Sequence, residues 1–346
     1  MSNSGKIGED TLGDIILPFC GARRDDVLCG PAFGVDISLL DLPDGLALAV
    51  ASDPLTLIPA LGLQESAWLS VHLLANDMAT TGFAPQFAQF VLNLPPSLTQ
   101  NDFREYWRWI DRYCSDIGLA ITGGHTGIVP GQESTIAGGG TFFLTAPRRA
   151  VKLSSDAKAG DAIIVTKGCA YSSAAILSKS FPETVRDRCG RETADHCAGL
   201  FYQTSSLRDA LIANAAGGIS AMHDVTEGGV LGAIYEMAVA SGNGVLVNSD
   251  ALPRDKHVSA VCALFDIDER FCIGAGSMII AVEKTGVKKV LNALAADGIF
   301  AADAGEFLPA GQGKILSENG IDRPLPYYQK DPYWAAFFNA QKKGWK

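Results

Sequence analysis

Apolar residues in the first half of the chain occur in two patterns: short continuous runs and a helical spacing. Residues 34–40 and 46–52 are apolar runs separated by Asp-Leu-Pro-Asp-Gly, a turn-rich stretch that predicts a β-hairpin. Between Ser66 and Thr80 the apolar residues recur at helical spacing and predict a helix. A second helix is predicted after Thr99, a typical N-cap residue, and Gly118 ends it.

Strands and helices alternate through the rest of the chain, which predicts α+β or α/β structure in both halves. A length of 346 residues suggests two domains. Composition shifts to Pro, Arg, Lys, Ser and Asp around residues 147–160, which predicts domains at 1–147 and 158–346. Further strands are predicted at 86–94, 119–122, 135–145, 162–166, 244–247 and 277–282, and helices at 205–216, 229–241 and 286–297.

Composition and charge exclude several classes of protein. The net charge of −10, from 28 basic and 38 acidic residues, argues against a nucleic-acid-binding protein. The longest stretch without a charged residue, 78–101, contains three prolines and predicts no membrane span. Charged residues near the N-terminus replace the apolar run of a signal peptide, so we expect a cytoplasmic protein.

Glycine and cysteine usage add two expectations. Charged residues make up 19% of the chain, and Gly138–Gly140 interrupt an apolar strand, which suggests close approach by another backbone or a ligand. We therefore expect a homodimer built from the N-terminal halves. The eight cysteines form no CxxC pair and are interpreted as free thiols; a zinc site at Cys189, His196 and Cys197 lacks a fourth ligand.

Five short segments combine an acid or a histidine with glycine or a strand end. They are residues 34–36, 51–53, 76–77, 122–126 and 223–229. Carboxylates in such places are hard oxygen ligands for Mg²⁺, and glycine at a helix start exposes amides to phosphate. Each segment alone is also typical of a turn or a cap, although a carboxylate on a mainly apolar helix, such as Asp77, needs a partner. The set suits a nucleotide with Mg²⁺, and no Walker-type loop is present.

The order of these segments resembles the AIR synthase-related superfamily. Its members include AIR synthase, selenophosphate synthetase, thiamine-monophosphate kinase and the hydrogenase-maturation protein HypE. Residues 75–85, Ala-Asn-Asp-Met-Ala-Thr-Thr-Gly-Phe-Ala-Pro, are similar to the family's Asn-Asp-x-Ala-x-x-Gly-Ala-x-Pro segment and give the most specific match. The resemblance extends from about residue 30 to residue 310.

The resemblance implies a two-domain α+β fold whose N-terminal domains pair into a dimeric, β-barrel-like core. It also implies that ATP and Mg²⁺ bind in a cleft near the dimer interface. The implied metal ligands are Asp36, Asp53, Asp77 and Asp224. The implied nucleotide contacts are Lys6, Asn76, Gly123, Gly124, His125, Thr126, Thr226, Glu227, Gly228 and Gly229.

One residue departs from the family pattern in a way that bears on metal binding. His125 stands where the family has an acid, and neutral imidazole is a poor Mg²⁺ ligand. We interpret the chain as an ATP- and Mg²⁺-dependent enzyme that activates an oxygen by phosphoryl transfer, most similar to HypE. The alternatives are a nucleotide-binding regulator or assembly protein without turnover, and a phosphoribosylformylglycinamidine cyclo-ligase.

The substrate is predicted to be a separate small molecule or partner. HypE proteins carry the reacting group on a C-terminal cysteine, whereas the last cysteine here, Cys272, lies in an apolar setting. Residues 332–338 are predicted to form a docked apolar helix. We therefore expect no thiocyanate formation on the chain itself.

Overall fold

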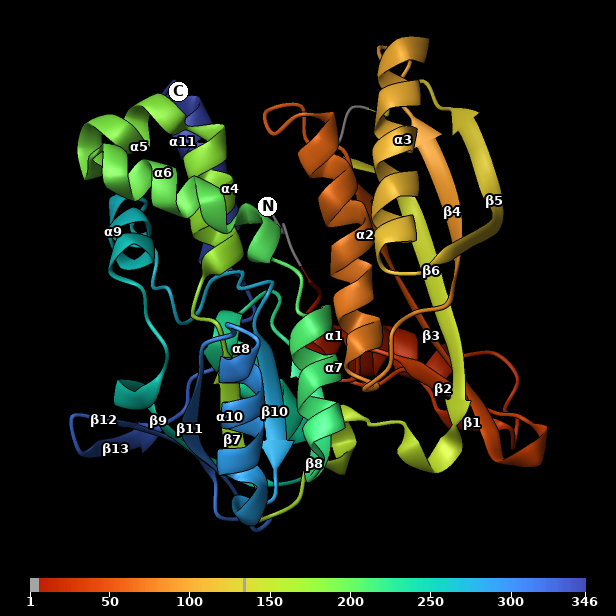
Figure 1. Ribbon diagram of the computed structural model, residues 1–346, viewed down its shortest axis with the longest axis vertical. Helices are drawn as coiled ribbons and strands as arrows, with labels where there is room; N and C mark the ends of the chain where they lie inside the picture. The colour runs from red at the N-terminus through yellow and green to blue at the C-terminus, as the bar shows by residue number, and fades with distance from the viewer. Residues whose placement is uncertain (1–5, 133–134) are drawn as a thin grey trace.

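The N-terminal domain is one open, twisted sheet with two helices on one face (Figure 1). The computed structural model describes residues 6–132 and 135–346. The sheet has the order β1-β2-β3-β6-β4-β5, and only β4 and β5 run parallel. The elements are α1 Glu9–Thr11, β1 Val27–Cys29, β2 Ser38–Asp41, β3 Leu46–Thr56, α2 Leu63–Ala79, β4 Phe87–Leu94, α3 Gln100–Asp116, β5 Ala120–Ile128 and β6 Ile136–Pro147.

Most predicted elements of this domain are confirmed. β2 and β3 form the hairpin, closed by a short 3₁₀ turn at Pro43–Gly45. The Thr99 side chain caps α3 by accepting from the Asp102 amide, as its position suggested. The inner face of the sheet alternates with the strand period, and its buried members, such as Phe90 and Phe142, pack under α2 and α3.

The glycines at 123–124 lie inside a strand, which corrects the prediction that a strand ends at residue 122. β5 continues to Ile128 because these glycines let it pass close to β4: a Cβ on Gly124 would lie 1.8 Å from the Phe90 carbonyl oxygen. Gly138 follows the same rule, since its Cβ would lie 1.9 Å from the Val91 carbonyl oxygen. The close approach predicted at 138–140 therefore involves the neighbouring strand β4.

The C-terminal domain contains a larger sheet and a separate group of helices. Its sheet order is β13-β12-β9-β11-β7-β10-β8, with β8 at one edge. The strands are β7 Ala162–Thr166, β8 Ile219–Asp224, β9 Gly244–Asn248, β10 Met278–Val282, β11 Ala301–Leu308, β12 Lys314–Glu318 and β13 Ile321–Pro324. The helices are α4 Tyr171–Ser180, α5 Pro182–Cys189, α6 Arg191–Gly199, α7 Leu207–Ala216, α8 Gly229–Ala240, α9 Lys256–Leu264, α10 Val287–Ala296 and α11 Pro332–Lys342.

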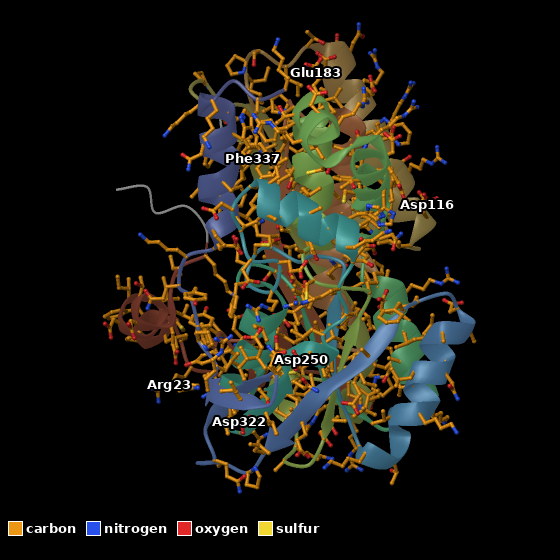
Figure 2. The ribbon with its side chains drawn as sticks, turned by 90° about the vertical axis from the view of Figure 1, so that its left-hand side faces the viewer. Arg23, Asp116, Glu183, Asp250, Asp322 and Phe337 are labelled. Atoms are coloured by element: carbon orange, nitrogen blue, oxygen red, sulfur yellow. The ribbon has the colours of Figure 1, made fainter. Side chains whose placement is uncertain are left out.

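The separate group of helices, formed by α4, α5, α6, α9 and α11, lies at one end of the molecule. Glu183 on α5 and Phe337 on α11 lie at this end, and Asp322 on β13 lies at the other (Figure 2). Phe337 is buried against Phe181, so α11 is the docked helix that the sequence predicts. The predicted α+β two-domain architecture is confirmed, whereas a barrel-like core requires a second chain and stays a prediction. None of the described helices is long and apolar enough to cross a membrane.

Helix α2 joins the two domains. Asn76, which is fully buried, donates to the Thr204 carbonyl and accepts from the Ser206 amide. Trp68, about two turns before Asn76 on α2, donates its indole N–H to the Thr204 hydroxyl. These bonds fix the helix that carries Asp77 on the second domain.

Candidate metal and nucleotide site

Three acids from both domains converge at one point. Asp36 lies just before β2, Asp77 lies on α2, and Asp224 ends strand β8. Each offers a carboxylate oxygen, and the three oxygens lie within 4.8 Å of one another. Within the described ranges this is the one cluster of His, Cys, Asp or Glu that meets such a spacing. The cluster contains three of the four predicted metal ligands.

The chain around Asp36 is shaped to reach the second domain. Gly34 has φ of 73°, and a Cβ there would lie 2.4 Å from the Glu236 carbonyl oxygen on α8. Only glycine tolerates both the backbone conformation and this close approach. The family-like Gly-x-Asp segment therefore places Asp36 opposite Asp224.

Burial and neighbouring carboxylates raise the pKa of two of the three acids. Burial and the Asp36 carboxylate raise the pKa of Asp224 to about 8. Burial and the Asp224 carboxylate raise the pKa of Asp77 well above its usual range. The buried Asp224 Oδ2 has no hydrogen-bond partner in the described structure. A divalent cation would provide the missing charge and the missing partner, and carboxylate oxygens are the ligands that Mg²⁺ prefers.

Asp53 borders this cluster on β3. Burial and the nearby Glu227 carboxylate raise the pKa of Asp53 to about 7, while Lys6 lowers it. Burial lowers the pKa of Lys6, but Glu236 and Asp36 outweigh that effect and keep the ammonium charged. Asp53 and Lys6, both predicted from the sequence, influence the pKa of Asp77 and Asp224, whereas Glu227 acts on Asp53.

Residues Gly123–Thr126 do not meet the acids within one chain. They lie exposed on the edge strand β5, with β4 and β6 between them and Asp53 on β3. Three inter-strand spacings amount to about 14 Å. The predicted contacts of Gly123, Gly124, His125 and Thr126 with the same nucleotide therefore require another chain or a large movement.

The glycine turn before α8 is already engaged by the chain. The Gly228 amide donates to Asp331 Oδ2 at 2.8 Å, and the Gly229 amide donates to the Thr226 carbonyl at 3.2 Å. Glu227 accepts from the Trp334 indole at 3.4 Å. A phosphate role for residues 226–229 stays a prediction and requires Asp331 to leave Gly228.

Asn76 and the cysteine group are placed away from the predicted ligands. Both ends of the Asn76 amide bond the second domain, so its side chain has no donor or acceptor directed to the acids. His196 pairs with Asp255 at 2.8 Å, while Cys189 donates to the Ala260 carbonyl, and no metal-type grouping forms there within the described residues. The weak zinc interpretation finds no geometric support.

Two residues beside the acids received no role from the sequence. His223 lies next to Asp224, and Glu236 is buried on α8. The sequence did contain a sign that Glu236 has a role, because it is the one charged residue in the apolar helix 229–240. A charge in such a place needs a partner, and the partner is His223.

Comparison with known proteins decides the family. Residues 34–142 match the model of the AIR synthase related protein N-terminal domain, and residues 158–317 match that of its C-terminal domain. The chain belongs to the AIR synthase related family. The acids Asp36 and Asp77 lie in the first matched domain and Asp224 in the second, so the acid cluster of this family member spans its two domains.

The curated relatives of this AIR synthase related protein include enzymes with two different activities. The chain is 27% identical over 267 residues to carbamoyl dehydratase HypE of Escherichia coli K12, covering 75% of each chain. It is 26% identical over 250 residues to selenide, water dikinase of Methanocaldococcus jannaschii, covering 66% of this chain and 68% of the relative. The chain is HypE-like in sequence.

Solved structures agree on the fold. Escherichia coli HypE superposes with a TM-score of 0.70 at 24% identity, covering 82% of this chain and 87% of that one. A HypE structure in complex with ATP gives 0.69 at 18% identity, covering 96% and 97%. Thiamine-monophosphate kinase from Stenotrophomonas maltophilia K279a gives 0.64 at 17% identity, covering 88% and 93%.

Proposed function

We propose that the protein is an ATP- and Mg²⁺-dependent enzyme that activates an oxygen atom of a substrate by phosphoryl transfer. The observation that carries this proposal is the convergence of Asp36, Asp77 and Asp224 with a buried, unpartnered carboxylate oxygen. HypE, whose ATP complex shares this fold, and selenide, water dikinase, a sequence relative, support the choice of ATP. The two domains together supply the ligands.

The roles of the residues follow from their charge and place. Asp36, Asp77 and Asp224 would hold the cation, and Asp53 lies beside them as a fourth acid. Bound Mg²⁺ would neutralise phosphate charge and orient the transferred group. Phosphoryl transfer depends mainly on positioning and charge stabilisation, so the protein needs no nucleophile of its own. Lys6 is the cation placed to approach a phosphate, because its ammonium lies beside the acids.

The experiment is calorimetric titration of the protein with ATP, with and without Mg²⁺. Asp77→Asn removes a cation ligand and keeps the shape of the side chain, so we expect Mg²⁺-dependent binding to weaken by at least tenfold. Asp322→Asn is the matched control. It lies on β13, at the opposite edge of the C-terminal sheet from β8 and Asp224.

Three outcomes distinguish the possibilities. Mg²⁺-dependent ATP binding lost in Asp77→Asn and retained in Asp322→Asn supports the site. Equal binding by both variants contradicts it. ATP binding without phosphate release, across candidate carboxamide and selenide substrates, would favour a nucleotide-binding assembly protein over an enzyme.

We also propose that two copies of the chain pair through the uncovered face of the N-terminal sheet. α2 and α3 cover one face of the sheet and leave the other uncovered (Figure 1). Apolar side chains lie exposed on this uncovered face. Phe87 and Val91 on β4 are 38% and 44% exposed on this face, and Phe87 contacts Phe143 on β6. Contiguous apolar surface of this kind marks an interface.

A second copy also accounts for the edge strand β5. Gly123–Thr126 lie on this edge strand and resemble a nucleotide-binding segment, but within one chain they are too far from the acids to share a nucleotide with them. Light scattering should give twice the chain mass, and Val91→Glu should shift it towards the monomer. A monomer at tens of micromolar protein, where ordinary interfaces are occupied, would contradict the dimer.

A further inference from the structure

Behind Asp36 lie two buried charged residues, His223 and Glu236, to which the proposed cation site gives no role. His223 Nδ1 lies 2.7 Å from Asp36 Oδ2, and His223 Nε2 lies 3.3 Å from Glu236 Oε2. Lys6 Nζ lies 3.0 Å from the same oxygen of Glu236, and the Tyr327 hydroxyl donates to Glu236 Oε1 at 3.0 Å. The His223 imidazole and the Glu236 carboxylate are each 2% exposed, whereas Lys6 reaches the network from the surface with 43% of its side chain exposed.

The geometry defines the charge of His223. Both ring nitrogens face a carboxylate oxygen, and an ionised carboxylate only accepts hydrogen bonds. A neutral ring would direct a lone pair at one of the two oxygens, so both nitrogens carry a proton. Burial lowers the pKa of His223, but Asp36 and Glu236 outweigh it and raise the pKa to about 10. Glu236, bonded to His223 and Lys6, has its pKa lowered to about 2 despite its burial.

Asp36 is held by only one of its oxygens. Oδ2 accepts from His223 and from the Ser154 hydroxyl at 3.3 Å. No hydrogen bond from the described residues reaches Oδ1, so that oxygen remains available to a cation. Asp36 belongs to the first domain, whereas His223 and Glu236 belong to the second. The imidazolium therefore fixes a ligand of one domain on the framework of the other.

We propose that His223, fixed by Glu236, is a positioning residue for the cation site: it orients Asp36 towards Asp224 across the domain boundary. The inference rests on the proposed function, because it requires a divalent cation at the acid cluster. Groups that hydrogen-bond metal ligands orient them, and their loss typically weakens metal affinity about 10- to 100-fold. Glu236 acts one step further away, so its effect is smaller.

The experiment measures Mn²⁺ binding to the full chain by electron paramagnetic resonance, with no substrate or turnover involved. The free ion gives the sharp signal, and the spectrum of bound Mn²⁺ reports its ligand geometry. His223→Gln should weaken Mn²⁺ affinity about 10- to 100-fold and alter the bound spectrum. Glu236→Gln should weaken it about tenfold. The double variant should lose less than the product of the two, because both residues act through Asp36.

His257→Gln is the matched control. His257 also bonds a hydroxyl and faces a carboxylate, through Thr193 and Glu192, but it lies on α9. We expect wild-type affinity and spectrum from it. Melting of each variant identifies any that fails to fold, and Glu236→Gln, which keeps its side-chain shape, then decides the test.

The outcomes separate this inference from the proposed function. Wild-type Mn²⁺ binding that Asp224→Asn abolishes and folded His223→Gln retains within twofold overturns the positioning role alone. Equal binding by wild type and Asp224→Asn, or no binding by wild type, overturns the cation site and the inference with it.

Discussion

Two buried groups of charged residues lie close to α2, and they differ in whether their charges are balanced. Lys167, which follows β7, donates to Asp209 at 2.8 Å and to the carbonyls of Ser205 and Gly276 at 2.6 and 2.8 Å. All three donors of the ammonium are used, and its charge is cancelled by one acid. At the acid cluster, Asp36, Asp77 and Asp224 face one another.

The difference separates a structural charge from a functional one. The Lys167–Asp209 pair fastens the segment that Asn76 and Trp68 bind from the other domain. The acid cluster keeps an excess of carboxyl groups whose raised pKa values record the repulsion. A fold retains such an excess at a cost in stability when the site serves a ligand, which agrees with the cation site that we propose.

The largest effect is expected from Lys167→Met. It leaves the Asp209 carboxylate buried without its cation, and breaking a buried pair in this way costs about 3–5 kcal/mol. Urea unfolding measures the loss. Lys284→Met removes the partner of Glu306 at a more exposed pair and should change stability by less than about 1 kcal/mol. Equal midpoints for the two variants would contradict the structural role of Lys167.

The second prediction is a pH dependence of stability to which Asp224 of the acid cluster and the neighbouring Asp53 contribute. Asp53 and Asp224 have folded-state pKa values raised to about 7 and about 8. The folded state therefore binds more protons than the unfolded state above pH 4, and its stability falls as the pH rises. We expect a decline of several kcal/mol between pH 5 and pH 8 without metal.

The charge network behind Asp36 acts in the same direction over part of this range. His223, with its pKa raised to about 10, contributes stability that is complete below pH 6.5 and is lost as the pH approaches 10. Mg²⁺ competes with the protons of the acids, so saturating Mg²⁺ should flatten the decline. Melting temperatures across pH, with and without Mg²⁺, measure this. A curve that Mg²⁺ leaves unchanged would contradict the cation site.

The third prediction concerns the sign of a single substitution. Asp224→Asn removes a carboxyl group whose ionisation the folded state disfavours and keeps the side-chain size, so the metal-free protein should become more stable by at least about 1 kcal/mol. The same change should abolish stabilisation by Mg²⁺. Thermal melting with and without Mg²⁺ reports both effects. A less stable metal-free variant would show that Asp224 has a structural partner.

The smallest effect is expected on β5. His125 is exposed on the edge strand, away from the acids, so His125→Ala should change the free energy of unfolding by less than about 0.5 kcal/mol. Mn²⁺ affinity should also stay at the wild-type value. Weaker Mn²⁺ binding by this variant would show that β5 reaches the acid cluster, which only a second chain or a large rearrangement allows.

The sequence by itself determined the elements and the family. Two apolar runs around a turn-rich stretch predicted the hairpin, and helical spacing of apolar residues predicted α2 and α3, because such spacing reports which face of a helix is buried. The spacing of Asp36, Asp77 and Asp224 within motifs resembling those of the AIR synthase related family was enough to propose a metal site. Both the element patterns and the motifs depend on residues that are close together in the sequence, so they can be read without a structure.

Only the tertiary structure decided which of the predicted residues meet. Residues Gly123–Thr126 are separated from Asp53 because β6 pairs between β3 and β4, an order that no local pattern encodes. The Gly228 amide is bonded by Asp331, far along the chain, and Asp36 is held by His223 from the other domain. These contacts depend on sheet order and domain packing, which arise from the burial of the whole chain and leave no period in the sequence.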